Sequence, residues 1–320
     1  MTFLVPKSPS PIAATSSISV EEMEALLSDW FGGHVVLTSS GRSALLLVLE
    51  ELGFSRYVHR VALPRLISKC VLEAAICSAF PVDVAEHTTA DATLRYHQYG
   101  FLQLTRPQGV VIDDIAQAFF SIADKGAPRA ITIFSLPKFF PTTTMVGGVI
   151  LADADLARRI RVRRDVAPAK SADVLAKESA TFIQGTDLAL LYTARLLNPR
   201  IDSSELGGLP TTHAELEEIR RKRGEVMETL LEAAPHLVPP GWASMLRENL
   251  PYAFPVSAPR DVLERLNREL QKVGVESDIY HIDVNRDMMH PKYEEMLLVP
   301  YSHLVPEPAL HDMVSILSSK

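Results

Sequence analysis

The sequence predicts an α/β fold: a three-layer large domain built on a mostly parallel sheet, followed by a small α+β domain. Two patterns lead to this prediction. In the first half of the 320 residues, short apolar runs without polar alternation, typical of strands buried on both faces, alternate with helix-like segments. Proline and glycine punctuation at 235–241 then precedes a shorter series of strands and helices.

The elements of the large domain follow from periodicity and from end signals. A helix at 20–30 opens with acidic residues, which favour a helix N-terminus, and its apolar residues recur at helical spacing. A strand at 34–37 leads through a small polar turn into a buried helix at 43–49, which forms the first unit of an α/β domain. Further helices are expected at 68–78, 156–164, 170–197 and 211–234, and further strands at 60–63, 81–84, 94–96, 109–112, 130–134 and 148–151.

The expected organisation has three parts: a flexible, Ser/Pro-rich lead at 1–18, a large domain at 19–235 and a small domain at 236–320. In the small domain we expect strands at 252–256 and 276–281 and helices at 260–273 and 307–317. The basic helix at 156–164 is expected to expose its arginines to solvent. They are Arg158, Arg159, Arg161, Arg163 and Arg164.

Composition and charge exclude several classes of protein. The net charge of -7 comes from 32 Lys+Arg against 39 Asp+Glu, whereas nucleic-acid binding needs a concentrated excess of basic residues. No apolar segment approaches the roughly 20 residues that a membrane span needs. No apolar run follows Lys7, as it would in a signal peptide. We therefore expect a cytoplasmic protein without nucleic-acid or membrane partners.

Neither the cysteines nor the histidines predict a disulfide or a metal site. Cys70 and Cys77 lie two turns apart in one expected helix, roughly 10 Å by helix rise, and are expected to be buried thiols. His97, His281 and His303 lack the short spacing of a set of metal ligands.

An acidic pair follows the buried run at 109–112. Asp113 and Asp114 come at a strand end, where a buried carboxylate is costly unless a cation or a metal ion pairs with it. The protonated pyridine nitrogen of pyridoxal phosphate (PLP) is one such cation, and Gln117 could reach the same ring. A metal site or a helix N-cap would also explain the pair, so it does not assign a function by itself.

A lysine follows the next buried strand. Lys138 lies in the loop after the run at 130–134, where lost solvation would lower the pKa of its amine and make it nucleophilic. Ser135, at the strand end, could donate its hydroxyl group to a phosphate. Taken alone, a lysine at this place can equally be a surface residue.

A candidate anion site precedes the helix at 43–49. Ser39, Ser40, Gly41 and Arg42 place small residues and backbone N–H groups at a helix N-terminus, whose dipole favours an anion. A routine N-cap has the same pattern. All three polar segments follow strands, and ligands of parallel sheets bind beyond the carboxyl ends of strands. We therefore expect the three segments to share one site.

Four segments carry a resemblance to a known family. They are Thr38-Ser39-Ser40-Gly41-Arg42-Ser43-Ala44-Leu45, His97-Gln98-Tyr99-Gly100, Asp113-Asp114-Ile115-Ala116-Gln117, and the stretch from Phe134-Ser135 through Lys138 to Gly147-Gly148-Val149. In this order they resemble the DegT/DnrJ/EryC1/StrS family, the sugar-aminotransferase branch of the fold-type I PLP enzymes. The resemblance runs through most of the chain.

The resemblance implies the aspartate-aminotransferase fold, a homodimer and transfer of an amino group from an amino acid to a keto acceptor. In the family the donor is usually glutamate and the acceptor a keto-sugar nucleotide. By the same resemblance Lys138 would carry PLP as a Schiff base, Asp114 would hold the pyridine nitrogen, and Gln117 would orient the ring. The phosphate would be bound by Ser40, Gly41, Arg42 and Ser135.

Two departures from the family pattern leave alternatives open. Ser135 and Lys138 lie closer together than in the family, and a gap-free alignment places Phe140 at the position of the family's lysine. A chain without that lysine would be a PLP- or pyridoxamine-phosphate-dependent enzyme of another kind, such as a dehydratase, or a non-catalytic homologue. The family's substrate-contacting segment is not recognisable, and residues such as Ser179, Thr181 and Gln184 stand in its place.

Three further residues are candidates for substrate contacts. Arg65, directly after Pro64, could bind a carboxylate or phosphate, or could form a surface ion pair. His97 lies at a strand end near the expected cofactor site, and Tyr280 lies where the family's small domain approaches the substrate.

Overall fold

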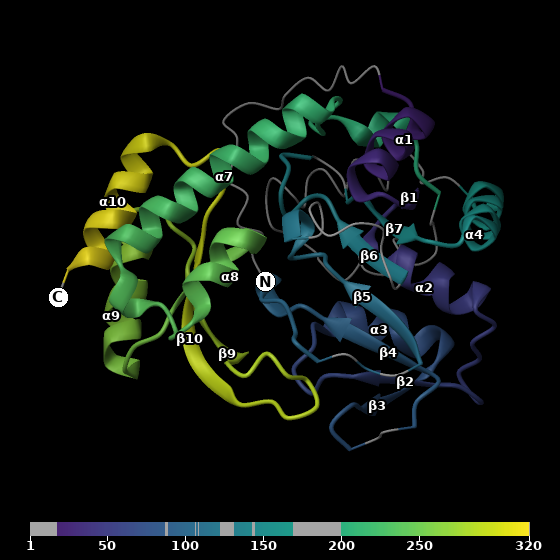
Figure 1. The fold of residues 1–320 in the computed structure, drawn as a ribbon, viewed down its shortest axis with the longest axis horizontal. Coiled ribbons are helices and arrows are strands. Elements are labelled where there is room, and N and C mark those ends of the chain that lie inside the picture. Colours follow the sequence, from purple (N-terminus) through teal and green to yellow (C-terminus); the bar gives the residue numbers. More distant parts are fainter. Residues whose placement is uncertain are drawn as a thin grey trace.

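A computed structural model describes residues 18–86, 89–105, 107, 109–121, 131–142, 145–168 and 200–319 of the chain. It confirms an α/β fold with a seven-stranded, mostly parallel sheet and a separate three-stranded sheet (Figure 1). The lead before residue 18 and the helix expected at 170–197, with Ser179, Thr181 and Gln184, lie outside the described residues.

The large sheet is built from strands that correspond to the predicted apolar runs. They are β1 (His34–Thr38), β2 (Arg60–Leu63), β3 (Phe80–Asp83), β4 (Ala92–Tyr96), β5 (Val110–Asp114), β6 (Ile131–Ser135) and β7 (Gly147–Leu151). Their order is β1-β7-β6-β5-β4-β2-β3. Strands β2 to β6 pair with one another in parallel, and β7 is antiparallel to both of its neighbours.

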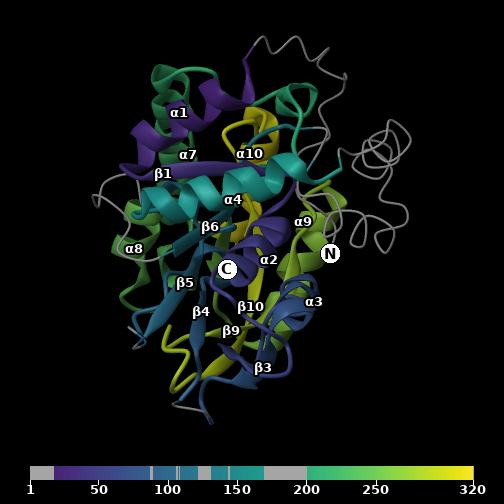
Figure 2. The same cartoon turned by 90° about the vertical axis from the view of Figure 1, so that its right-hand side faces the viewer.

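Helices cover both faces of the large sheet. They are α1 (Val20–Phe31), α2 (Gly41–Glu51), α3 (Lys69–Ser78), α4 (Ala154–Val166), α7 (His213–Ala233) and α8 (Trp242–Asn249). Figure 2 shows α2, α3 and α4 in front of the sheet, on the side away from α8 and the small sheet. The sheet therefore forms the middle layer between two helical layers.

Successive residues of each strand serve the two layers in turn. Val36 and Ile133 pack into the core that includes α2, α3 and α4. Their neighbours Leu37 and Phe134 belong to the larger core that includes α1, α7 and α8. Burial on both faces explains why the strands lack polar alternation, because every position meets an apolar layer.

The expectation that α4 exposes its arginines is wrong for Arg164; Arg158, Arg159 and Arg163 are exposed, and Arg161 is partly buried. Arg164 is buried and forms an ion pair with the buried Glu24 of α1, and Arg161 binds the other oxygen of that carboxylate at 2.9 Å. Arg163 binds Glu50 of α2 at 2.8 Å. Sequence alone could not show this, because the acidic partners lie more than a hundred residues earlier in the chain.

These ion pairs also satisfy the free edge of β1. The Leu37 N–H donates to Glu24 at 2.9 Å, and Arg164 donates to the Leu37 carbonyl at 3.0 Å. Arg161 donates to the Val35 carbonyl at 3.1 Å. An edge strand presents unpaired backbone groups, and here side chains of α1 and α4 pair with them. The strand that leads into α2 is thus held from both sides.

The two cysteines are free thiols in α3. Cys70 is partly buried, whereas Cys77 is exposed, so the expectation of two buried thiols is wrong for Cys77. It occupies the solvent side of an amphipathic helix, and the short apolar sequence around it did not reveal which side faces out.

The small sheet has the order β8-β10-β9 and is antiparallel throughout. Its elements are β8 (Ala253–Val256), α9 (Arg260–Lys272), β9 (Asp278–Asp283), β10 (Tyr293–Pro300) and α10 (Glu307–Ser318). Neither β10, which is the central strand, nor the short helix α8 was predicted from the sequence. The charged residues at the start of β10 and the proline at its end hid the apolar run between them.

The loop between β9 and β10 fastens the small sheet to the large one. Met288 is buried against Ala62 of β2 and Val82 of β3. The Leu104 N–H donates to the Arg286 carbonyl at 2.6 Å. The two sheets are therefore joined by this loop as well as by the core that includes α7 and α8.

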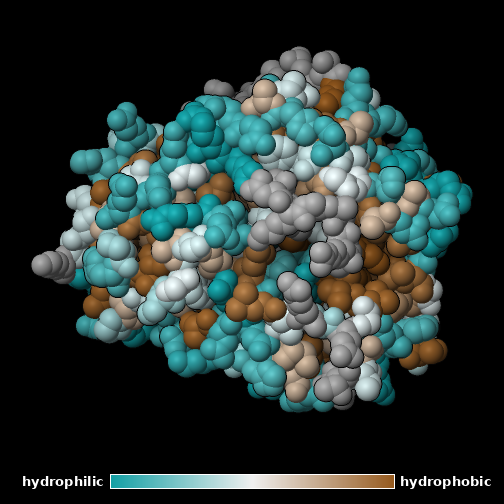
Figure 3. Space-filling view, viewed as in Figure 1, coloured by the Kyte–Doolittle hydropathy of each residue, from teal (hydrophilic) through white to brown (hydrophobic). Residues whose placement is uncertain are grey.

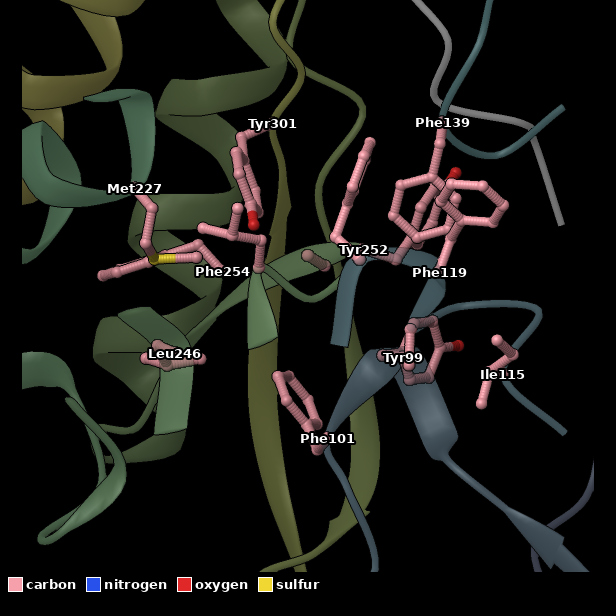
Figure 4. Close-up of a cluster of buried hydrophobic side chains, with 14 of the residues drawn as sticks. Tyr99, Phe101, Ile115, Phe119, Phe139, Met227, Leu246, Tyr252, Phe254 and Tyr301 are labelled. Atoms are coloured by element: carbon pink, nitrogen blue, oxygen red, sulfur yellow. The ribbon is translucent and has the colours of Figure 1, made fainter. Parts of the chain in front are cut away.

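Aromatic side chains fill the space between the two sheets. In the view of Figure 4, Tyr252 stands between Tyr301 on one side and Phe139 and Phe119 on the other. The rings of Phe139 and Tyr252 lie 6.3 Å apart at 74°. This packing gives the region after β6 a fixed position relative to the small sheet.

The outer surface over α7, α9 and α10 is mostly hydrophilic (Figure 3). None of the described helices is long and apolar enough to cross a membrane. The domain boundary expected at 235 coincides with a short 3-10 helix, Pro235–Leu237, and stays a prediction.

Candidate active site

The register of the sheet brings the predicted anion turn next to Ser135. Gly147 of β7 pairs with Thr38 at the end of β1 and with Ser135 at the end of β6. A Cβ atom on Gly147 would lie 2.2 Å from the Gly41 nitrogen, and one on Gly41 would lie 2.9 Å from the Phe134 carbonyl oxygen. Only glycines allow the start of α2 to approach β6 so closely.

The turn before α2 is rich in hydroxyl groups. Ser40 is the N-cap, and its Oγ accepts from the Ser43 N–H at 3.1 Å. The Thr38 hydroxyl donates to the Ser40 carbonyl at 2.8 Å, and the Ser39 and Ser43 hydroxyls lie 3.0 Å apart. Hydroxyl donors and the positive end of a helix dipole suit an anion such as a phosphate.

The two acids after β5 have different surroundings. Asp113 forms a two-point ion pair with Arg95 of β4, with Nη2 of Arg95 2.6 Å from Oδ2, and lies 3.7 Å from Nε2 of His97. Burial alone would raise the pKa of Asp113, but His97 and Arg95 outweigh it and hold the pKa below its ordinary value. Asp113 is therefore a charged, structural partner of β4.

Asp114 is almost fully buried and has no such partner. Burial raises its pKa, opposed by the charge of Lys138 and by the Ala116 N–H, which donates to Oδ1 at 2.9 Å. A buried carboxylate in this condition gains most from a cation placed beside it. Asp114 therefore stays the candidate for pairing with a cationic ring nitrogen.

Lys138 lies in a single helical turn after β6, where the Phe140 N–H donates to the Leu136 carbonyl at 3.1 Å. Burial lowers the pKa of its ammonium group; Asp114 opposes this shift, and Arg42 adds to it. Within the described part of the chain, Lys138 makes no hydrogen bond or ion pair. An amine with a lowered pKa is a better nucleophile and proton acceptor at neutral pH.

The helical turn also separates Lys138 from Phe140. Phe140 is buried in the aromatic cluster, with its ring 5.3 Å from that of Phe119 at 90°. Lys138 instead lines the cavity described below. The shortened spacing thus places a lysine, and not Phe140, at the candidate site.

Gln117 is held by its oxygen. Its Oε1 accepts from the Tyr99 N–H at 2.8 Å and from the Tyr96 hydroxyl at 3.4 Å. Tyr96 is held in turn by Ser68, whose hydroxyl lies 2.6 Å from the tyrosine oxygen. These contacts leave the Nε2 hydrogens of Gln117 without a partner among the described residues, and free to donate to a ligand.

A cavity of about 610 Å³ lies between the two sheets. From the large sheet it is lined by Tyr99, Gln117 and Lys138, and from the small sheet by Glu276, Asp278 and Tyr280, among others. Its size is in the range of pockets for small molecules.

Tyr99 is a site residue that sequence reasoning did not single out. It has a positive φ of 53°, and a Cβ atom on the next residue, Gly100, would lie 2.1 Å from the Gln117 carbonyl oxygen. This strained turn lets Tyr99 hold Gln117 by its N–H while its ring reaches the cavity. The Tyr-Gly pair after β4 was the available signal, because such a turn favours glycine.

The three candidate substrate residues are not all brought together. Tyr280 lines the cavity, and its ring lies 5.0 Å from that of Tyr99. His97 is buried, and its Nδ1 accepts the Gln103 N–H at 3.0 Å. Its Nε2 lies beside Asp113, and it does not line the cavity. Arg65 is exposed and pairs with Asp83 and Glu86, each at 3.1 Å.

Within the part of the chain that the structure describes, no group of three or more histidine, cysteine and acidic residues could hold a metal ion. Of the predicted cofactor residues, Lys138 and Gln117 line the cavity, whereas Asp114 and the turn before α2 are not part of its lining.

This set agrees with a match to a protein family. Residues 28–182 match the family model described as "Putative PLP-dependent aminotransferase". The matched range contains the anion turn, Asp114, Gln117 and Lys138. The match therefore indicates a PLP-dependent aminotransferase.

Solved structures show that this chain has the fold of a DegT/DnrJ/EryC1/StrS aminotransferase. One such aminotransferase from Brucella abortus is 18% identical, with a TM-score of 0.65 over 99% of this chain and 90% of that chain. DesV from S. venezuelae, solved with a ketimine intermediate, is 19% identical, with a TM-score of 0.65 over 95% and 90%. NtdA from Bacillus subtilis, solved with pyridoxamine phosphate, is 16% identical, with a TM-score of 0.64 over 93% and 76%. No curated protein sequence matches the chain.

The residues of this aminotransferase fit PLP. The cofactor presents a phosphate, a pyridine nitrogen, a ring hydroxyl and an aldehyde. The turn before α2 offers donors for an anion, Asp114 a carboxylate for a cation, Gln117 two free donors and Lys138 an amine. Each part of the cofactor thus has a chemically matched group in one region.

Proposed function

We propose that this aminotransferase moves an amino group from an amino acid, glutamate, to a keto-sugar. The observation that carries the proposal is the amine of Lys138, which lines the cavity with a lowered pKa close to the buried Asp114. The donor and the acceptor class are supported by the resemblance of the motifs and by the sugar aminotransferases among the similar structures, such as CalS13 from Micromonospora echinospora.

In the proposed site, each residue binds, orients or moves a proton. Ser40, Gly41, Arg42 and Ser135 hold the phosphate of the cofactor at the N-terminus of α2. The carboxylate of Asp114 pairs with the protonated pyridine nitrogen, and the Nε2 group of Gln117 donates to the ring hydroxyl. When bound, PLP supplies an electron sink that makes the carbon bearing the amino group acidic.

Lys138 acts as the proton carrier in this proposal. With PLP bound, Nζ of Lys138 would hold the cofactor before the substrate binds, and once free it would accept and move the proton of the substrate carbon that bears the amino group. Burial lowers the pKa of the amine, so it can accept a proton near neutral pH. The aromatic packing around Phe139 and Tyr252 limits access of water from this side.

The alternatives that Phe140 left open have less support. A PLP- or pyridoxamine-phosphate-dependent dehydratase or a non-catalytic homologue would need the lysine position to be empty, whereas Lys138 lines the cavity and Phe140 packs in the core. The proposal includes a homodimer in the cytoplasm, as the resemblance and the composition lead us to expect.

A half-reaction tests the proposed function. Protein loaded with PLP is mixed with L-glutamate without any acceptor, and the absorbance of the bound cofactor is followed together with 2-oxoglutarate. We expect one equivalent of 2-oxoglutarate per site as the cofactor becomes pyridoxamine phosphate, and a keto-sugar should then restore the first spectrum. Release of ammonia, or an unchanged cofactor, would contradict transamination.

A further inference from the structure

The part of the cavity wall that comes from the small sheet is acidic. Glu276 and Asp278 line it just before and at the start of β9, and both side chains are exposed. Among the described residues, Glu276 makes no hydrogen bond or ion pair. Asp278 accepts the Ile279 N–H at 2.8 Å and lies beside Tyr280, but it has no cationic partner in the described part of the chain. The cavity thus has two carboxylates available to a ligand.

Aromatic faces accompany these carboxylates. Tyr99, Tyr252 and Tyr280 line the same cavity, and the rings of Tyr99 and Tyr280 lie 5.0 Å apart at 39°. Tyrosine faces attract organic cations, and tyrosine hydroxyls bind the hydroxyls of a sugar-like ligand. Carboxylates and tyrosine faces together are suited to a polyhydroxylated molecule that carries an ammonium group.

Cations are scarce in the same wall. Lys138 is the one lysine or arginine among the described residues that line the cavity, and the proposed function engages it with the cofactor. Arg65, a candidate carboxylate ligand, is exposed and already paired with Asp83 and Glu86. A phosphate or a second carboxylate on the substrate would therefore be repelled by Glu276 and Asp278. Among the described residues that line the cavity, no further lysine or arginine neutralises these two charges.

We propose that Glu276 and Asp278 select a substrate that carries a positive charge beside its hydroxyl groups, so that the acceptor is an amino-bearing keto-sugar without a phosphate at this end. This inference deepens the proposed function and rests on it. The same carboxylates should weaken the binding of glutamate, because its distal carboxylate is repelled. Removing them therefore changes the binding of a cationic sugar and of glutamate in opposite directions.

The test uses three hexoses that differ in charge: D-glucosamine, D-glucose and D-glucuronate. Their dissociation constants for the PLP-loaded protein are measured by ligand-observed NMR, below the pKa of the glucosamine ammonium group. The variants are Glu276→Gln, Asp278→Asn and the double substitution. Glu269→Gln is the control, because Glu269 pairs with Lys272 on the exposed face of α9 and does not line the cavity.

We expect wild type to bind glucosamine at least tenfold more tightly than glucuronate, with roughly fivefold from each exposed carboxylate. The double variant should lose this preference, keep its affinity for glucose and bind glutamate more tightly, and Glu269→Gln should behave as wild type. Added salt should reduce the preference.

Two results would overturn the inference: equal binding of the three sugars by wild type, or a preference that survives in the double variant. A double variant that loses affinity for all ligands alike has been damaged structurally. In that case the ratio of the glucuronate and glucosamine dissociation constants of Glu276→Gln decides. These binding measurements are independent of turnover. A failed glutamate half-reaction would refute the proposed function, whereas the sugar dissociation constants test only the selection by Glu276 and Asp278. The two failures are therefore distinguishable.

Discussion

At the scale of single residues, the pair Asp113 and Asp114 shows how neighbouring acids acquire different roles. Asp113 lies beside Arg95 of β4 and His97 directly after β4, and its pKa is lowered despite burial. Asp114 lacks a cationic partner of that kind, and burial raises its pKa. Both acids could be found in the sequence, but their roles could not be separated there, because the partners of Asp113 come from a strand that only the fold places beside it.

Substitution of the two acids should have opposite consequences. Asp114→Asn should keep the protein folded and lower the rate of the glutamate half-reaction by roughly 100-fold or more, because an amide cannot stabilise a cationic ring nitrogen. Asp113→Asn should instead destabilise the fold by roughly 2–4 kcal/mol, because it leaves Arg95 without its carboxylate partner. The cost is below that of a fully buried pair because Arg95 is partly exposed to water. Urea unfolding and single-turnover absorbance on both variants check this. Equal rates for Asp114→Asn and wild type would contradict the assignment.

The same acid predicts a dependence of stability on pH. Folding lowers the pKa of Asp113, so its contribution is present above the ordinary aspartate pKa of about 3.9 and is lost as the pH falls through the lower, folded value. Wild type should therefore lose stability relative to Asp113→Asn in this acidic range, and urea midpoints of the two proteins should converge there. A difference that stays constant down to the lowest pH would contradict the ion pair.

At the scale of elements, β1 is positioned by side chains as much as by its sheet partner. Glu24 and Arg164 bond both backbone groups of Leu37, one residue before the turn that is expected to hold the phosphate. The strands and helices around this unit could be predicted, because apolar runs and helix caps are local signals. The clamp could not, since α1 and α4 lie far apart in the sequence, and β10 was missed because charged residues and a proline frame it.

Removal of Glu24 tests this clamp. Glu24→Ala should destabilise the fold by about 3–5 kcal/mol, because it leaves the buried Arg164 and its neighbour Arg161 without their carboxylate. The control Glu218→Gln breaks an exposed pair with Arg221 and should change the free energy of unfolding much less than Glu24→Ala does. The free energies of unfolding come from urea titration. Similar costs for the two variants would show that the clamp adds no more than a surface ion pair.

The helical turn after β6 is a second case in which local geometry decides a functional question. A gap-free alignment points to Phe140, but the turn sends Phe140 into the aromatic core and leaves Lys138 at the cavity. Spacing in the sequence cannot show in which direction successive side chains of a turn point. The sequence therefore left two residues of this loop open, and the geometry of the turn favours Lys138.

At the scale of the whole molecule, the site depends on two sheets that meet. In the proposed function, residues that follow strands of the large sheet bind the cofactor, and the segment before and at the start of β9 supplies the acidic wall of the cavity. The loop between β9 and β10 and the aromatic cluster around Tyr252 hold the two parts together. Sequence motifs predicted residues for the cofactor half, whereas the proposed substrate half depends on tertiary contacts between distant segments and had no local signature.

The most direct test of the central claim is whether the cofactor is attached to Lys138. Wild type and Lys138→Ala are loaded with PLP, treated with borohydride, digested and examined by mass spectrometry, with Lys69→Ala as a control for an exposed lysine. We predict that wild type and Lys69→Ala carry the reduced cofactor on the peptide that contains Lys138, and that Lys138→Ala binds PLP without covalent attachment. Fixation on another lysine, or no fixation in wild type, would contradict the role assigned to Lys138.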